Sequence, residues 1–372
     1  MITIRDSRDR ETLVFTDNIE KQALNQIEIL TEYEAYSDSV IRIMPDVHAG
    51  KGCTIGTTMT IRNRVTPNLV GVDIGCGMLT INIGRTQPDS SRLDQVIRRA
   101  VPSGFSTHKK PVARFDFSSL RCQKHVDTGR AKLSIGTLGG GNHFIEVARG
   151  EKSGNYYLII HSGSRKLGTE VCEHYQHMAI ARLKERLGKA KLNMAERDLA
   201  YLEGSGFNDY MHDMAIVQRY ASYNRATMAA IITEEMNVTE EERFETIHNY
   251  IDFKRMILRK GAVSAEEGER LLIPLNMRDG SLLCIGKGNS DWNYSAPHGA
   301  GRLMSRNKAR ALININDFRE AMKGIHTSTV GKATIDEAPQ AYKPMKEIID
   351  SIGDTAILAD HLKTVYNFKA LS

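Results

Sequence analysis

The feature that most constrains the fold is a helical pattern over about residues 168–243, placed between two regions of short apolar runs. Within this segment apolar residues recur at helical spacing and no proline occurs, which is typical of long helices. On either side, runs of strand length end at turn residues; they are SVIRIMP, CTIGTTMTI, LVGVDI, MLTINIG, HFIEVA, YYLIIHSG, RLLIPLNM and SLLCIGKGN. Two further segments, MSRNKARALI and QAYKPMKEIIDSI, have a helical pattern. The chain is therefore expected to be α+β, with mixed or antiparallel sheets flanked by helices and a helical insertion.

We expect a single domain over residues 1–372. The chain has 41% hydrophobic and 26% charged residues, a composition that can bury a substantial core. No Pro/Ser-rich linker, low-complexity tract or internal repeat interrupts it. The motifs described below come from both sides of the helical segment, which argues against independent domains.

The sequence also predicts a cytoplasmic protein. No apolar run approaches the roughly 20 residues that a membrane-spanning helix needs, and the opening residues lack a basic start followed by an apolar block. Five widely spaced cysteines, an odd number, favour reduced thiols over a disulfide framework. We expect no membrane contact, and a monomer as the default state.

Positive charge is concentrated in two segments, although the net charge is only +5. Residues 103–134 carry seven Lys/Arg against two acids, and residues 301–346 carry nine against four. Such segments can bind phosphates. On charge alone, a solvated face with scattered lysines explains them equally well.

Histidines in open-backbone motifs are the strongest chemical signal. Five of the twelve lie among glycine, serine or asparagine: His48, His143, His161, His248 and His298. The stretch GVDIGCGM adds Asp73 and Cys76. A lone histidine is more often a hydrogen-bonded core or surface group, but this set offers oxygen, nitrogen and sulfur ligands together. Thiolate and imidazole suit zinc, and a carboxylate also admits manganese or iron. A bridging thiolate can hold two ions, as phosphoryl-transfer enzymes require.

Other interpretations of these motifs stay open at this level. Cys76 can instead be a nucleophile with a nearby histidine as its base. TLGGGNHF offers backbone N–H groups to a phosphate but is not a P-loop, and neither is GKGCTIG. The residues alone indicate a metalloenzyme that handles phosphate.

A family resemblance narrows these alternatives. In order along the chain, MPDVHAGKG, VGVDIGCGM, GTLGGGNHFIEV, HSGSR, IHNY, RKGA, SAPHGAGRLMSR, DEAPQAYK and NFK resemble the RtcB family of RNA ligases, over about residues 40–369. The resemblance implies joining of RNA 2′,3′-cyclic phosphate or 3′-phosphate ends to 5′-hydroxyl ends, in RNA repair or tRNA splicing. It also implies GTP and two Mn²⁺ ions as cofactors, and an accessory activator as a possible partner.

The resemblance assigns roles to individual residues. His298 is the nucleophile that accepts GMP. Cys76 bridges two metal ions, with His161 and His248 on one and Asp73 and His143 on the other. The implied nucleotide contacts are Asn142, Phe144, Glu146, His248, Asn249, Pro274, Asn276, Met277, Ser281, His298, Gly299, Ala300, Gly301, Tyr342 and Lys369. Three arginines that closely follow the motifs suit RNA phosphates, and the alternative is that they are structural residues paired to carboxylates: Arg165, Arg302 and Arg306. Asp46 and His48 are expected to support the metal ligands, although a structural role explains His48 equally well.

One departure from the family pattern affects the nucleotide site. Residues 274–277 are PLNM where the family usually has PGSM, so Leu275 replaces a glycine and Asn276 a serine. We therefore expect altered guanine-side contacts. Two alternatives follow: a two-metal phosphodiesterase that opens RNA cyclic phosphates without ligation, and a non-enzymatic RNA-binding protein. The complete ligand set with His298 argues against the second.

Overall fold

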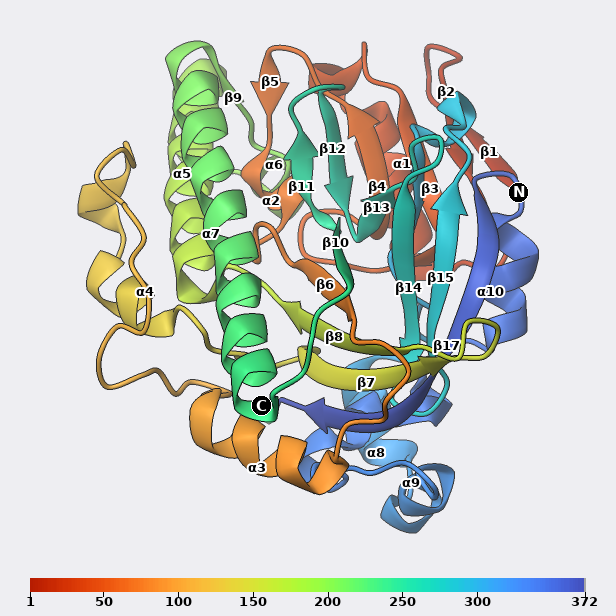
Figure 1. Ribbon diagram of the computed structural model, residues 1–372. Coiled ribbons are helices and arrows are strands. Elements are labelled where there is room, and N and C mark those ends of the chain that lie inside the picture. The colour runs from red at the N-terminus through yellow and green to blue at the C-terminus, as the bar shows by residue number, and fades with distance from the viewer. Residues whose placement is uncertain (371–372) are drawn as a thin grey trace.

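The computed structural model describes residues 1–370, which form two large β-sheets and the helices packed against them (Figure 1). The first sheet has six strands, in the spatial order β1 (Ile2–Arg5), β2 (Glu11–Val14), β3 (Ile41–His48), β4 (Ile55–Thr60), β12 (Ile257–Lys260) and β11 (Asn249–Asp252). Its neighbours pair antiparallel, except that β2 and β3 pair parallel.

The second sheet has seven strands and is antiparallel throughout. Its spatial order is β10 (Glu242–Ile247), β6 (Gly77–Asn82), β8 (Tyr156–Ser162), β7 (Phe144–Gly150), β17 (Ala356–Lys369), β15 (Gly280–Gly286) and β14 (Arg270–Asn276). The predicted α+β class with mixed and antiparallel sheets is confirmed.

The helical pattern corresponds to α5 (Arg165–Leu187), α6 (Met194–Asp198) and α7 (Gly204–Met236), and strand β10 follows. α5 and α7 lie side by side (Figure 1), and α7 also packs on β6 and β8. Both long helices end at a residue in the left-handed conformation, Gly188 and Asn237. Strands from before and after this stretch pair within each large sheet, so the helices are inserted into a shared sheet scaffold. The single-domain organisation stays a prediction.

Shorter elements complete the description. β5 (Arg64–Val65) pairs with β9 (Leu202–Glu203), and β13 (Ala262–Ser264) with β16 (Ser295–Pro297). The other α-helices are α1 (Lys21–Glu32), α2 (Pro67–Val70), α3 (Ser90–Ala100), α4 (Thr128–Ser134), α8 (Arg306–Leu312), α9 (Ile315–Ala321) and α10 (Met345–Ile352). Single 3₁₀ segments lie at Glu34–Tyr36, Gln123–His125, Ser290–Trp292, Lys332–Glu337 and Pro339–Ala341.

Two expectations for local structure were wrong. The run LVGVDI is not a strand: Pro67 begins α2, which includes Leu69 and Val70, and Gly71 ends that helix with a φ of +100°. The helix expected over QAYKPMKEIIDSI begins only at Met345, because Pro344 is its N-cap and proline ends a preceding helix.

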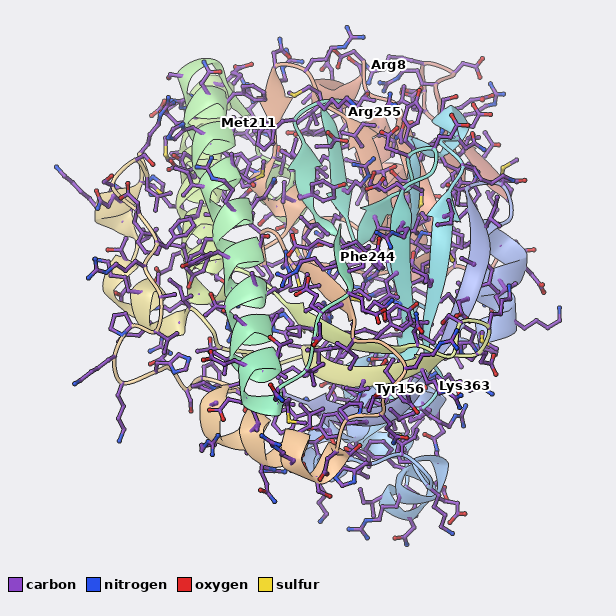
Figure 2. The ribbon with its side chains drawn as sticks, viewed as in Figure 1. Arg8, Tyr156, Met211, Phe244, Arg255 and Lys363 are labelled. Atoms are coloured by element: carbon purple, nitrogen blue, oxygen red, sulfur yellow. The ribbon has the colours of Figure 1, made fainter. Side chains whose placement is uncertain are left out.

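The long helix α7 contributes to two hydrophobic clusters. Tyr210, Met214 and Val217 pack in the cluster shared with α5 and the six-stranded sheet, and Met228 and Ile232 pack in the one shared with α3 and the seven-stranded sheet. Figure 2 shows side chains filling the space between α7 and the sheets. Within residues 1–370 no helix is both long and apolar enough to cross a membrane.

Candidate active site

The turn between α2 and β6 carries Asp73 and Cys76 to the start of β6. Gly71 and Gly75 lie in the left-handed region that glycine occupies without strain. A Cβ at Gly75 would also lie 2.9 Å from the Cβ of Ala221 on α7. The backbone can therefore fold tightly here, and the N–H of Cys76 donates to the carbonyl of Asp73 at 3.2 Å.

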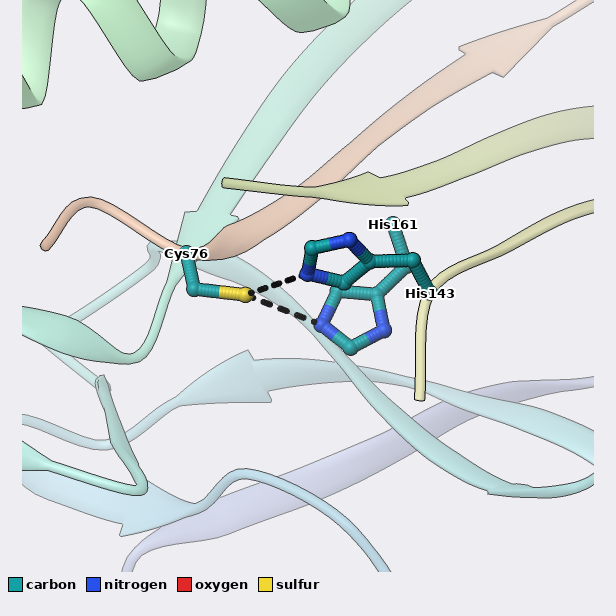
Figure 3. A group of neighbouring side chains, drawn as sticks. All are labelled: Cys76, His143 and His161. Atoms are coloured by element: carbon teal, nitrogen blue, oxygen red, sulfur yellow. Dashed lines mark hydrogen bonds between the residues drawn. The ribbon is translucent and has the colours of Figure 1, made fainter. Parts of the chain in front are cut away.

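Cys76, His143 and His161 form a buried cluster (Figure 3). His143 directly precedes β7 and His161 lies in β8, which pairs with both β6 and β7. Sγ of Cys76 lies 3.5 Å from Nε2 of His143 and 3.4 Å from Nε2 of His161. The ligand atoms of all three lie within 4.8 Å of one another.

The other two predicted metal ligands extend this cluster on opposite sides. Nε2 of His161 lies 3.4 Å from Nε2 of His248, which follows β10. Nε2 of His143 lies 3.1 Å from Oδ2 of Asp73. Cys76 thus stands between a His161–His248 side and a His143–Asp73 side. This is the division that the family resemblance implies for two ions.

The distances in the cluster fit metal ligation. Ligand atoms about 2.0–2.3 Å from a tetrahedral ion lie about 3.3–3.8 Å apart, a range that includes the two spacings around Cys76. Nδ1 of His143 is 2.9 Å from the carbonyl of Leu138, and Nδ1 of His161 is 3.2 Å from that of Asn142. Each Nδ1–H donates to its carbonyl, so each Nε2 lone pair is directed to the cluster.

The protonation states of the clustered side chains also favour binding of a metal cation. Burial lowers the pKa values of His161 and His248 well below the ordinary value, which keeps both imidazoles neutral. Burial and the neighbouring Asp73 raise the pKa of Cys76. A thiolate at Cys76 therefore requires added positive charge, which a divalent ion supplies.

His298 is held by a buried carboxylate next to this cluster. Its Nδ1 lies 2.6 Å from Oδ2 of Asp46, and its backbone N–H donates to the same oxygen at 3.2 Å. Its ring centroid is 5.1 Å from that of His248. Nδ1 of His48 lies 3.0 Å from the carbonyl of Asp46. Asp46 and His48 thus lie beside His298. Their expected support of the metal ligands stays a prediction.

A cavity of about 660 Å³ opens beside His298 and collects most of the predicted nucleotide contacts. Of those fifteen residues, only Asn249 does not line it. Asn249 lines a smaller neighbouring cavity of about 230 Å³, together with Asp73, Cys76, His248 and His298.

Three buried polar atoms of this larger cavity have no hydrogen-bond partner within residues 1–370: Oε1 of Glu146, Oγ of Ser281 and Oδ1 of Asn367. The other carboxylate oxygen of Glu146 accepts from Nδ2 of Asn367 at 2.8 Å. Burial raises the pKa of Glu146 to about 8. Unpaired buried groups are costly, so this wall is arranged for a polar ligand.

Charged side chains form a second wall. Nζ of Lys369 lies 2.7 Å from Oε2 of Glu337 and 2.8 Å from the carbonyl of Asn142. Arg306 pairs with Glu337 at 2.6 Å, and Arg302 at 3.5 Å. Burial alone would raise the pKa of Glu337, but Lys369 and Arg306 lower it to about 2. Arg302 and Arg306, predicted for RNA phosphates, thus line the nucleotide cavity as ion-paired residues.

Arg165 lies elsewhere, on the Asp73 side of the cluster. It lines a separate cavity of about 620 Å³ with Asp73 and His143. Its Nη1 lies 3.3 Å from Nδ1 of His143, a contact and not a hydrogen bond when Nδ1–H donates to Leu138. A Cβ at Gly139 would lie 1.7 Å from Nη1 of Arg165, so glycine is needed there.

Polar residues of these cavities that the sequence did not single out include Glu337, Asn367 and Lys260. Lys260 is 5% exposed, donates to the carbonyl of Asn68 at 2.9 Å and lines the cavity that contains Cys76. All three lie within motifs of the family pattern, DEAPQAYK, NFK and RKGA. The motifs therefore pointed to these residues, but the role of each residue depends on contacts between distant parts of the chain.

Comparisons with known proteins agree with the motif pattern. The sequence profile of "tRNA-splicing ligase RtcB" matches residues 33–370. The "RNA-splicing ligase RtcB" of Escherichia coli K12 is 33% identical over 357 residues, which cover 84% of this chain and 86% of that protein. The "tRNA-splicing ligase RtcB" of Aeropyrum pernix is 27% identical over 403 residues, covering 82% of each chain.

Proposed function

Since the chain belongs to the RtcB family, we propose that it is an RNA ligase that joins 2′,3′-cyclic phosphate or 3′-phosphate ends to 5′-hydroxyl ends. GTP and two Mn²⁺ ions are the proposed cofactors, and His298 is the residue that becomes guanylylated. The observation that carries this proposal is the Asp46–His298 pair beside both the ligand cluster and the larger cavity.

The pair prepares His298 for attack on phosphorus. A carboxylate can only accept, so Asp46 holds the proton on Nδ1 and leaves the Nε2 lone pair free. Nε2 attacks the α-phosphorus of GTP and pyrophosphate leaves. The imidazole becomes positively charged in this step, and the Asp46 carboxylate, 0% exposed, stabilises that charge.

His298 then passes GMP on. An oxygen of the RNA 3′-phosphate displaces Nε2 from phosphorus, and His298 returns to the neutral form. The 5′-hydroxyl of the second strand next attacks the activated 3′-phosphorus, and GMP leaves as the phosphodiester forms. A cyclic phosphate must first be opened by water. Metal ions held by Asp73, Cys76, His143, His161 and His248 would neutralise phosphoryl charge and orient in-line attack.

The unpaired wall of the cavity favours guanine. Oε1 of Glu146, which has no partner among the described residues, can accept from the adjacent N1–H and N2–H₂ donors of guanine, and these donors favour the ionised form of a carboxyl whose pKa burial raises. Adenine lacks that pair of donors. The alternative function, hydrolysis of cyclic phosphates without ligation, leaves both the Asp46–His298 pair and this cavity wall without a role.

Incubation with α-³²P-labelled GTP and Mn²⁺ tests the proposal. We expect a labelled protein that the variant His298→Ala does not form, whereas His177→Ala, which replaces an exposed histidine on α5, forms it normally. RNAs with 3′-phosphate and 5′-hydroxyl ends should then be joined. Opening of cyclic phosphates without GTP, with no adduct and no joined product, would support the hydrolase instead.

A further inference from the structure

The cavity beside Arg165 is separate from the proposed nucleotide cavity and lies on the Asp73 and His143 side of the metal cluster. Besides Asp73 and His143, it is lined by the turn Gly104–Thr107 and by three basic side chains, Arg130, Arg165 and Lys166. It therefore connects two of the candidate metal ligands to part of the basic segment 103–134.

Phe105 is the most conspicuous residue of this cavity. Its side chain is 89% exposed, more than any other large hydrophobic residue of the described chain. Its backbone is nevertheless fixed: the N–H of Ser106 donates to the carbonyl of Ser103 at 3.2 Å, and Gly104 has a φ of +63°. The N–H of Gly104 donates to the carbonyl of Gly139 at 2.7 Å. An apolar ring is thus held out in water by an ordered turn.

Two arginines hydrogen-bond to backbone carbonyls of the same turn. Arg130 donates to the carbonyl of Phe105 at 2.9 Å, and Arg165 donates to that of Gly104 at 3.2 Å. Neither guanidinium forms an ion pair with a carboxylate of residues 1–370, unlike Arg302 and Arg306. Lys166, the third basic side chain of the cavity, pairs with Glu170 at 2.8 Å. The turn therefore places an exposed aromatic ring next to two guanidinium groups that no carboxylate of the described residues neutralises.

We propose that Phe105 is an RNA-binding residue, on which the nucleobase next to the reacting end stacks while Arg130 holds the adjoining phosphodiester. An aromatic platform beside basic side chains is how proteins bind single-stranded nucleic acid. The inference rests on the proposed RNA ligase function and extends it to a subsite outside the metal cluster. Either reacting strand presents the same chemistry, a base followed by a phosphodiester.

The kinetic test uses Phe105→Ala, Phe105→Trp and a matched control, Met194→Ala, which removes an exposed apolar side chain on α6. Phe105→Ala should raise KM for RNA ends about 5- to 30-fold, the effect of losing one stacked base. Phe105→Trp should restore KM, and the yield of guanylylated protein should be the same in all four proteins. Joining of RNA by Phe105→Ala with unchanged KM would overturn the proposal and leave Phe105 as a contact for a protein partner.

A binding test separates the two strands and does not depend on catalysis. The fluorescent base 2-aminopurine is placed either next to a 3′-phosphate or next to a 5′-hydroxyl. Stacking on Phe105 quenches it in the strand that occupies the subsite, and Phe105→Ala abolishes the quenching. Equal fluorescence with wild type and Phe105→Ala for both strands would refute the subsite. Quenching by a wild-type protein that forms no GTP adduct would instead refute the proposed ligase function alone.

Discussion

Oδ2 of Asp46 lies 2.6 Å from Nδ1 of His298 and also accepts the backbone N–H of His298 at 3.2 Å. A single buried oxygen therefore fixes both the ring and the main chain of the proposed nucleophile, although the two residues are 252 positions apart in the chain.

Replacement of Asp46 should damage guanylylation without removing metal. In Asp46→Asn the amide can donate to Nδ1, which shifts the proton to Nε2 and blocks attack. We expect the rate of adduct formation to fall about 10²- to 10⁴-fold, with bound manganese unchanged by elemental analysis. Adduct formation at the wild-type rate would show that Asp46 does not set the protonation of His298.

Replacement of Cys76 should remove metal and activity together. Serine is a weaker ligand than a thiolate, so Cys76→Ser should lower manganese affinity about 100-fold or more and abolish the adduct in parallel. Cys284→Ser, at a cysteine buried in β15, is the matched control and should keep both. Retention of two ions and a normal adduct in Cys76→Ser would exclude a bridging thiolate.

The buried carboxyl of Glu146 predicts how stability depends on pH without nucleotide. Because burial raises its pKa to about 8, the folded protein keeps this proton after the unfolded chain has released it. The stabilisation that comes from the tighter proton binding of folded Glu146 is therefore lost as pH rises from about 4.5 to about 8. Glu146→Gln should be the more stable protein at pH 8, by about a few kcal/mol.

Thermal unfolding at pH 5 and pH 8 measures this difference. Glu173→Gln, at an exposed position on α5, is the control and should differ from wild type by the same amount at both pH values. If the difference in unfolding temperature between wild type and Glu146→Gln is the same at both pH values, the pKa of Glu146 is not raised.

The change from PGSM to PLNM should affect GTP binding less than the position of this motif in the cavity suggests. Oδ1 of Asn276 accepts the backbone N–H groups of Arg278 and Asp279 at 3.0 Å each, and Nδ2 donates to Asp279 at 2.8 Å. The side chain is therefore used in the β14–β15 turn. Asn276→Ala should destabilise the protein by about 1–2 kcal/mol and change KM for GTP less than about threefold.

Ser281→Ala provides the comparison, because it removes a hydroxyl that lines the cavity without a partner among the described residues. It should raise KM for GTP more than Asn276→Ala does. The reverse order would place Asn276 rather than Ser281 at the nucleotide.

Short motifs predicted which residues meet because strand pairing brings them together. Cys76, His143 and His161 each lie at or next to the end of a strand, and β6, β8 and β7 are neighbours in one sheet. The β-type runs indicated these strands, and the family pattern implied the ligands.

Other parts of the site depend on long-range geometry that no local pattern contains. Asn367 meets Glu146 through the pairing of β17 with β7, which shifts register between Thr364 and Tyr366. The ion pairs of Arg302 and Arg306 with Glu337 depend on how the segment after β16 folds against the 3₁₀ segment Lys332–Glu337. The basic bias of residues 301–346 therefore could not distinguish an RNA surface from paired charges.

The position of β17 has a consequence for biosynthesis. This strand lies between β7 and β15 and supplies Asn367 and Lys369 to the nucleotide cavity, yet it leaves the ribosome after every other strand of both sheets. Until it has been made, a nascent chain carries two open strand edges, which are prone to pair with other chains. Translation must therefore reach the last cavity residue before the polypeptide can either close its larger sheet or enclose its nucleotide.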